Sequence, residues 1–172
     1  MRTIPKADLS EIAPFYHGYL QMITEPDVMQ ALHSRLSAVL TLWGTLPPAK
    51  HDYAYADGKW TVKEVLGHII DTERVMAYRA LAFGRGETQP LPGFNENDYV
   101  KNALFQRRTL PDLLAEFEMV RKSSILLFAN MSDEKLACQG IASDSPVTVR
   151  ALASVILGHE LHHSRILQER YL

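Results

Sequence analysis

The sequence predicts an all-α protein that folds as a four-helix bundle with long crossover loops. Four segments repeat apolar side chains at helical spacing, and each has residues typical of helix ends. Each predicted helix has roughly 19 to 23 residues, which corresponds to a length of about 30 Å. Helices of similar length favour a bundle, and no segment shows the alternation expected of a convincing strand.

The first predicted helix covers about residues 25–43. Thr24 and Asp27 are placed to cap its N-terminus, Pro26 falls in its first turn, and Gly44 follows its last residue. Its apolar face is expected to point into the bundle. The residues of that face are Val28, Leu32, Leu36, Val39, Leu40 and Trp43.

The other three helices have similar signals at their N-termini. The second covers about residues 61–83, where Thr61 and Glu64 match a capping box that satisfies exposed backbone N–H groups. The third covers about 109–131 and has a proline in its first turn. The fourth begins at Thr148 and continues almost to the last residue.

The connections are long enough to cross the ends of the bundle. They comprise residues 46–59, 84–108 and 132–147. Long loops in compact domains are often functional, so 84–108 is the candidate wall or lid of a pocket. The first 23 or so residues are rich in aromatic side chains and are expected to pack along the outside of the bundle. The whole chain, residues 1–172, is interpreted as a single domain.

Composition excludes several classes of protein. The formal net charge is −2 and no stripe of Lys or Arg appears, so neither nucleic acid nor a membrane is an expected partner. The N-terminus lacks the apolar core of a secretion signal. Cys138 is the single cysteine, which rules out an intrachain disulfide and a Cys-x-x-Cys metal site. The cytoplasm is therefore the expected location.

Three histidines point to a metal site. His68 shares a face of the second helix with apolar residues, so its side chain is expected to point inward. His159 and His163 are four residues apart, which places both imidazoles on one face of the fourth helix. Burying unpaired imidazoles is costly, and a shared metal ion would satisfy all three.

The predicted site therefore binds one divalent metal ion through His68, His159 and His163. Three protein ligands leave positions open to water or substrate, which is typical of a catalytic site. Two alternatives remain open. His162 is three residues from His159 and could replace His163, although it lies about 100° further round the helix. The inward histidines could also form hydrogen bonds to one another without a metal.

The residues around these histidines suggest further roles. Residues 159–163 read HELHH and match the zincin pattern HExxH, in which the glutamate is a general base. A zincin is not expected, because no histidine follows that could be a third ligand. Glu160 is still a candidate to support a ligand histidine or to act as an acid–base residue, and Asp71 is a candidate to hydrogen-bond an imidazole or bound water. Arg74 and Arg79 are interpreted as structural partners of Glu73 or other acids.

Several motifs resemble the DinB-like superfamily, and particularly its YfiT-like branch of metal-dependent hydrolases and thiol S-transferases. The resemblance spans nearly the whole chain. The motifs that carry it are KWTVKEVLGHIIDTE at 59–73, GHELHH at 158–163, PLPGFNE at 90–96 and PFYHGY at 14–19.

The resemblance implies a four-helix bundle with crossed connections that holds nickel or zinc. Carried over by position, the metal ligands would be His68, His159 and His163. It also implies a homodimer and a small-molecule substrate, which in some relatives is a low-molecular-weight thiol activated as the thiolate. It does not imply DNA binding. The resulting hypothesis is a metal-dependent enzyme that acts by hydrolysis or thiol transfer. The alternative is a non-catalytic metal-binding or stress-response protein in which the metal is structural.

Overall fold

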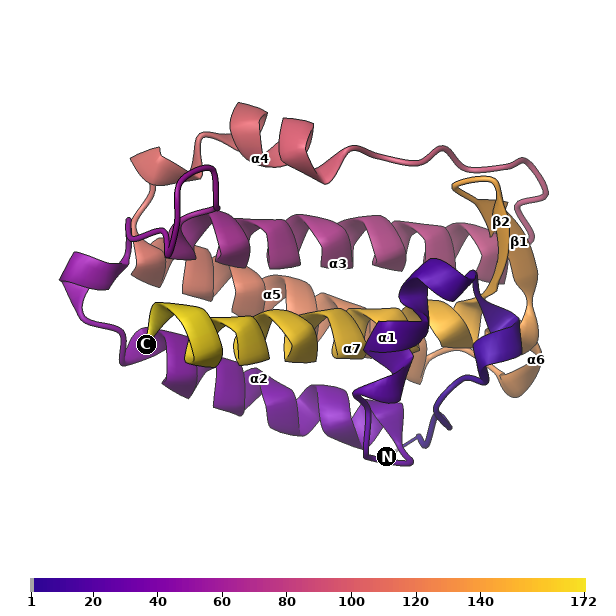
Figure 1. Ribbon diagram of the computed structural model, residues 1–172. Helices are drawn as coiled ribbons and strands as arrows, with labels where there is room; N and C mark the ends of the chain where they lie inside the picture. Colours follow the sequence, from indigo (N-terminus) through magenta and orange to yellow (C-terminus); the bar gives the residue numbers. More distant parts are fainter. Residues whose placement is uncertain (1) are drawn as a thin grey trace.

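Four long helices lie lengthwise beside one another in the computed structural model, which describes residues 2–172 (Figure 1). They are α2 (Val28–Gly44), α3 (Val62–Gly84), α5 (Leu110–Ala129) and α7 (Val149–Ile166). The predicted all-α four-helix bundle is therefore confirmed. No helix within residues 2–172 is long and apolar enough to cross a membrane.

The connectivity of the bundle requires crossover loops. Helix α3 packs against α5 and α7, and α2 packs against the same two helices. Helices α2 and α3, which are consecutive among the long helices, therefore lie diagonally opposite each other (Figure 1). The chain must cross the end of the bundle between α2 and α3, and again between α5 and α7, as the long connections predicted.

The N-termini of three long helices follow the predicted caps. At α3, the Thr61 amide donates to Glu64 Oε2 at 2.8 Å, and the Glu64 amide donates back to Thr61 Oγ1 at 3.3 Å. Thr109 and Thr148 cap α5 and α7 through their side chains. Helix α7 continues as a short π-helix to Tyr171.

Helix α2 begins later than predicted. Asp27 alone caps it, accepting from the Met29 amide at 3.0 Å, while Thr24 instead donates to its neighbour Glu25. The Asp27 carboxylate also accepts from the amide of Ile4 at 3.1 Å. This contact with the N-terminal segment holds the residues before Val28 extended, so a tertiary interaction sets the start of the helix.

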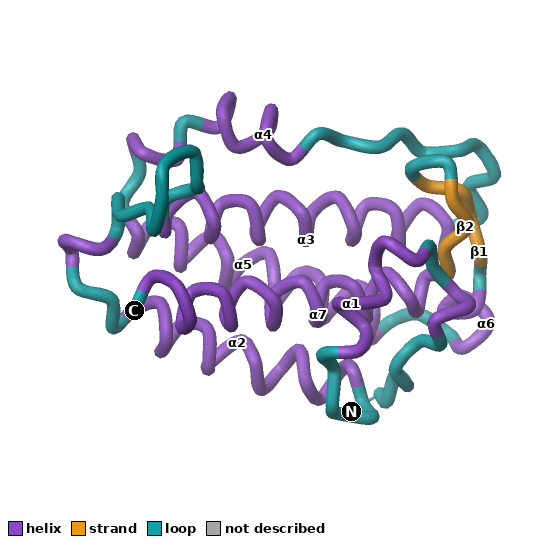
Figure 2. Tube along the Cα trace, viewed as in Figure 1, coloured by secondary structure: helices purple, strands orange, loops and turns teal. Residues whose placement is uncertain are grey.

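The connections contain short elements that the sequence did not reveal (Figure 2). Helix α4 (Glu96–Ala103) lies along α3 within the predicted 84–108 loop. Helix α6 (Asp133–Ala137) is followed by a hairpin of β1 (Gln139–Ala142) and β2 (Ser145–Thr148). The sequence offered no strand candidate of convincing length, and the two strands observed have only four residues each. Strands of four residues are too short to display a readable alternation, and the turn between them lacks the usual Asn-Gly signal.

The N-terminal segment packs on the bundle, as expected. It contains short 3-10 helices at Leu9–Glu11 and Pro14–Tyr16, and then α1 (His17–Gln21), which lies against α7. Its approach to α7 requires a glycine, because a Cβ atom on Gly158 would lie 2.3 Å from the carbonyl oxygen of Tyr19.

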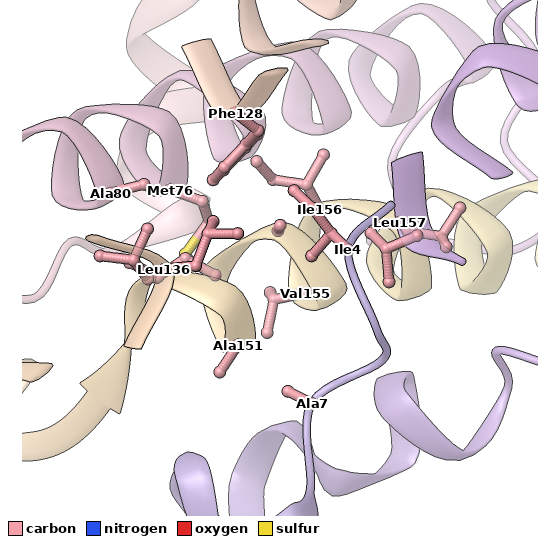
Figure 3. Packing of buried hydrophobic residues seen from close by; sticks show 14 of the residues in the cluster. Ile4, Ala7, Met76, Ala80, Phe128, Leu136, Ala151, Val155, Ile156 and Leu157 are labelled. Atoms are coloured by element: carbon pink, nitrogen blue, oxygen red, sulfur yellow. The ribbon is translucent and has the colours of Figure 1, made fainter. Parts of the chain in front are cut away.

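The buried apolar side chains form two clusters with a polar layer between them. One cluster gathers near the hairpin and the N-terminal segment, where Met76, Phe128 and Val155 are buried (Figure 3). The other lies toward the opposite end of the bundle and includes Trp43 and Phe117. On every long helix a buried or half-buried polar residue falls between the two clusters. These residues are Arg35, Glu73, Arg121, His159, Glu160 and His163. His68, which lies among the α3 residues of the second cluster, packs its ring against that of His159.

Candidate metal centre

The polar layer brings the three predicted histidines together. His68 projects from α3, and His159 and His163 project from adjacent turns of α7, which packs against α3. The Nε2 atom of His159 lies 2.9 Å from that of His68 and 3.1 Å from that of His163. All three nitrogen atoms lie within 4.8 Å of one another.

Burial keeps these imidazoles neutral. Loss of solvation lowers the pKa of His68 from 6.5 to about 4 and that of His163 to about 3. The pKa of His159 is also lowered, first by its burial and then by the neighbouring histidines. A neutral imidazole has a free lone pair on one ring nitrogen, which is the form that binds a metal.

Two of the three nitrogen–nitrogen separations fit one bound cation, and the third, between His68 and His163, lies within the 4.8 Å span of the cluster. Two nitrogens that each lie about 2.0–2.1 Å from one ion are separated by roughly 3.0–3.4 Å, depending on the angle between them. The two measured separations of 2.9 and 3.1 Å are close to this range. Hydrogen bonds alone satisfy the cluster less well, because Nε2 of His159 lies near two other ring nitrogens. A neutral imidazole nitrogen either donates one proton or offers one lone pair, so it can form a full hydrogen bond with only one of them.

A cavity of about 460 Å³ opens onto the cluster. Aromatic side chains from three parts of the chain line it, with Tyr19 from α1, Trp60 before α3 and Phe94 from the 84–108 connection. The Trp60 ring lies 4.7 Å from the His68 ring, and the Tyr19 ring lies edge-on to His159 at 5.4 Å. The 84–108 connection thus forms part of the pocket wall, as predicted.

The structure favours His163 over His162 as the third residue of the cluster. His162 contacts the rings of Tyr19 and His163 at 5.4 and 5.0 Å, but it is not part of the group of converging nitrogens. It lines a smaller neighbouring hollow, which Trp60 and His163 also line, but not the main cavity. The four-residue spacing places His159 and His163 on one face of α7, whereas His162 is turned to the side.

Glu160 does not reach the cavity, contrary to its predicted acid–base role. Its fully buried carboxylate forms an ion pair with Arg35 of α2, whose Nη2 and Nε donate to it at 2.7 and 3.0 Å. It also accepts a hydrogen bond from Ser164 at 2.6 Å. The residue after His159 on a helix points about 100° away from it, toward α2 rather than α3.

Asp71 is also turned away from the cluster. Within residues 2–172 it does not line the cavity, and its carboxylate lies 3.9 Å from Nη1 of Arg74. Burial raises its pKa, and the Arg74 charge partly offsets this effect. The side chain that approaches Nδ1 of His68 is Thr72, whose Oγ1 lies 3.5 Å away. The predicted contact of Asp71 with an imidazole is therefore corrected.

Sequence reasoning missed several residues that line the cavity. Tyr16 and Tyr19 belong to the N-terminal segment, Glu96 begins α4, Ser143 lies in the hairpin turn, and Ser145 begins β2. No spacing rule connects these positions to the histidines. The one available signal was the aromatic content of the N-terminal segment, which indicated packing but not a role in the site.

A family profile described as the DinB superfamily matches residues 31–167. The chain belongs to the DinB superfamily. The matched region contains all four long helices except the first turn of α2, and it includes the three clustered histidines. No curated protein sequence matches this DinB superfamily chain.

Two solved structures share the fold of this DinB superfamily member. YfiT from Bacillus subtilis, described as a probable metal-dependent hydrolase with an unusual four-helix bundle topology, superposes with a TM-score of 0.74. It is 17% identical over 83% of this chain and 82% of its own. A mycothiol-dependent maleylpyruvate isomerase superposes with a TM-score of 0.64 and 12% identity, over 79% of this chain and 57% of its own. At these identities the likeness extends to the fold alone.

Proposed function

We propose that this chain is a metal-dependent enzyme that acts on a small molecule. His68, His159 and His163 would hold one divalent ion, nickel or zinc, where the polar layer meets the cavity. The observation that carries the proposal is the convergence of three neutral imidazole nitrogens beside a cavity of about 460 Å³. A structural metal site usually closes around four protein ligands, whereas three ligands facing a cavity leave room for a substrate.

A bound divalent ion would supply a Lewis acid that lowers the pKa of a water or thiol, giving a nucleophile at neutral pH. The chain's own residues would hold the imidazoles in place and orient the substrate. Trp60 and Tyr19 pack against two of the imidazoles and limit their rotation. The aromatic wall would exclude water from the substrate and orient an apolar group beside the ion.

The reaction would be either hydrolysis or transfer of a low-molecular-weight thiol. The description of YfiT as a probable metal-dependent hydrolase supports the first, and that of the isomerase as mycothiol-dependent supports the second. Both reactions use the same neutral histidines and the same open cavity.

Elemental analysis of the purified, untagged protein tests the metal site. We expect about one equivalent of nickel or zinc per chain, lost in His159→Ala, because two remaining imidazoles bind a divalent ion far more weakly. His162→Ala is the matched control and should retain the metal, since its ring lies outside the converging group. Metal-loaded protein would then be assayed for ester and amide hydrolysis and for thiol transfer.

Two results would contradict the proposal. One is a wild-type protein that contains no metal and that added nickel or zinc neither binds nor stabilises against heat. The other is an equal metal content in the wild type and in His159→Ala. A metal that is lost with His159 without any effect on activity would instead support a structural role for the ion.

A further inference from the structure

Arg79 is a buried cation without a counter-charge. It lies on α3 and is 3% exposed, and within residues 2–172 no carboxylate lies within ion-pairing distance of it. Its expected partner, Glu73, pairs instead with Arg121 of α5 at 3.0 Å. Burying a charge without an opposite charge is costly, so Arg79 needs an explanation beyond packing.

The present contacts of Arg79 are all with neutral groups. Its Nη2 donates to the carbonyl oxygen of Pro92 at 2.8 Å and to Ser143 Oγ at 2.9 Å. Its Nη1 has only the sulfur of Met76, at 3.8 Å. These contacts tether the 84–108 connection to the hairpin turn. They leave the charge unbalanced, and no hydrogen bond from Nε–H is present within residues 2–172.

Arg79 lies at the end of the cavity opposite the histidines. His68, Thr72, Met76 and Arg79 share one face of α3, and the eleven steps from the first residue to the last correspond to about 16 Å. The cavity extends along this face from His68 past Thr72 and Met76 to Ser143, whose hydroxyl accepts from Arg79. In Figure 1 the hairpin lies at the C-terminal end of α3, consistent with this direction.

A small hollow lined by Arg79 adjoins the cavity. It has a volume of about 10 Å³ and shares Tyr16, Met76 and Ser145 with the main cavity. A space of roughly 10–15 Å³ holds one water molecule, and therefore one oxygen atom of a ligand.

We propose that Arg79 binds a carboxylate of the substrate, with Ser143 and Ser145 as neighbouring hydrogen-bond donors. The inference rests on the proposed function, because it assumes that the substrate reacts near the histidines. The substrate would be an elongated molecule with an apolar or aromatic middle that lies along the Met76 side of the cavity. One end would carry the carboxylate, and the other would carry the reacting group.

Among residues 2–172, Glu96 is the one fixed charge on the wall of the main cavity, and its sign opposes a carboxylate. It lies in the exposed first turn of α4, where solvent and salt screen its field. Arg79 is buried, so its interaction with a bound carboxylate is screened much less. Glu96→Gln is therefore a suitable control for a general charge effect.

Binding of matched ligands to the wild-type protein tests this assignment. The probes are phenylalkanoates of increasing chain length and the corresponding amides, which have the same size but carry a neutral NH2 group in place of one charged oxygen, measured by isothermal titration calorimetry. We expect the carboxylate to bind roughly tenfold to a hundredfold tighter than its amide at one favoured chain length. Arg79→Gln should abolish this preference and leave the affinity for the amide unchanged, while Glu96→Gln should preserve it.

A second measurement does not depend on a variant that keeps its fold. The signal of the Arg79 Nε–H group in a nitrogen–proton spectrum of the wild type should shift with the carboxylate and not with the amide. Equal binding of both ligands, no binding of any probe at about 10 mM, or an unmoved Arg79 signal would each overturn the assignment. So would a preference that survives in Arg79→Gln.

Repeating the titrations after removal of any metal separates this inference from the proposed function. A carboxylate preference that disappears with the metal but persists in Arg79→Gln would identify the ion as the anion site and refute the role of Arg79. A protein that binds no metal but still prefers the carboxylate through Arg79 would support this inference while refuting the metal-dependent reaction.

Discussion

Replacing Arg35 with alanine would test whether Glu160 stabilises the bundle rather than taking part in the reaction. The Glu160 carboxylate is fully buried and accepts two hydrogen bonds from Arg35, at 2.7 and 3.0 Å. In the variant it would keep only the hydrogen bond from Ser164 at 2.6 Å. Removing one partner of a buried ion pair destabilises a protein by about 3–5 kcal/mol, because the other charge stays buried and unpaired.

Urea unfolding followed by circular dichroism would measure this loss. For a chain of this size, about 3–5 kcal/mol corresponds to a fall in melting temperature of roughly 6–20 °C. Arg165→Ala is the matched control, because its partner Glu169 is 53% exposed at a distance of 3.7 Å. Loss of such a surface pair changes the free energy of unfolding by about 0–1 kcal/mol.

A double-mutant cycle isolates the interaction itself. In the Glu160→Gln background, Arg35→Ala should cost only about 1 kcal/mol, because no buried negative charge remains to be paired. Metal content should be unchanged in Glu160→Gln. The reasoning would be refuted if Arg35→Ala cost the same in both backgrounds. It would also be refuted if Glu160→Gln lost activity while keeping full stability and metal.

Three further changes test the packing of α1 on α7, the burial of the imidazoles and the position of Asp71. Gly158→Ala should lower the free energy of unfolding by about 1–3 kcal/mol, since the new methyl group would collide with the carbonyl of Tyr19. Gly18→Ala, where nothing lies within 4 Å of the added atom, should not lower it in the same urea titration. In metal-free protein, burial lowers the pKa of His68 from its ordinary value of 6.5 to about 4. Between pH 6.5 and pH 4 the unfolded chain therefore binds more protons than the folded one. The free energy of unfolding should therefore fall by several kcal/mol as the pH drops through this window, and a flat profile would contradict the burial of the imidazoles. Asp71→Asn should retain the metal by elemental analysis, because Asp71 does not line the cavity, and loss of metal would restore its predicted role at the site.

Helix positions followed largely from local sequence. The Thr61–Glu64 box, the threonine caps of α5 and α7 and the apolar spacing act within a few residues, so they can be read without knowledge of the fold. The start of α2 could not be read in this way, because the N-terminal segment contributes the amide of Ile4 to the cap at Asp27. The hairpin was missed because its strands depend on pairing rather than on a pattern of their own.

The sequence by itself also determined which histidine side chains could contribute to one site. Helical period places His159 and His163 on one face, and the inward position of His68 on a second helix made a shared site the economical interpretation. These inferences depend only on the geometry of single helices. They could not include the Tyr19 and Glu96 side chains of the cavity wall, which come from separate segments.

Tertiary structure alone decided which polar residues near the histidines belong to the cavity. Glu160 adjoins His159 in the chain, yet it faces α2 and pairs with Arg35. Arg79 is distant from His68 along the chain, yet it shares the same face of α3 and lines a small hollow that adjoins the same cavity. The direction of a side chain around its helix follows from the sequence, but the group that it meets there depends on which helices are neighbours. That arrangement is set by the crossed connections and by packing between distant segments.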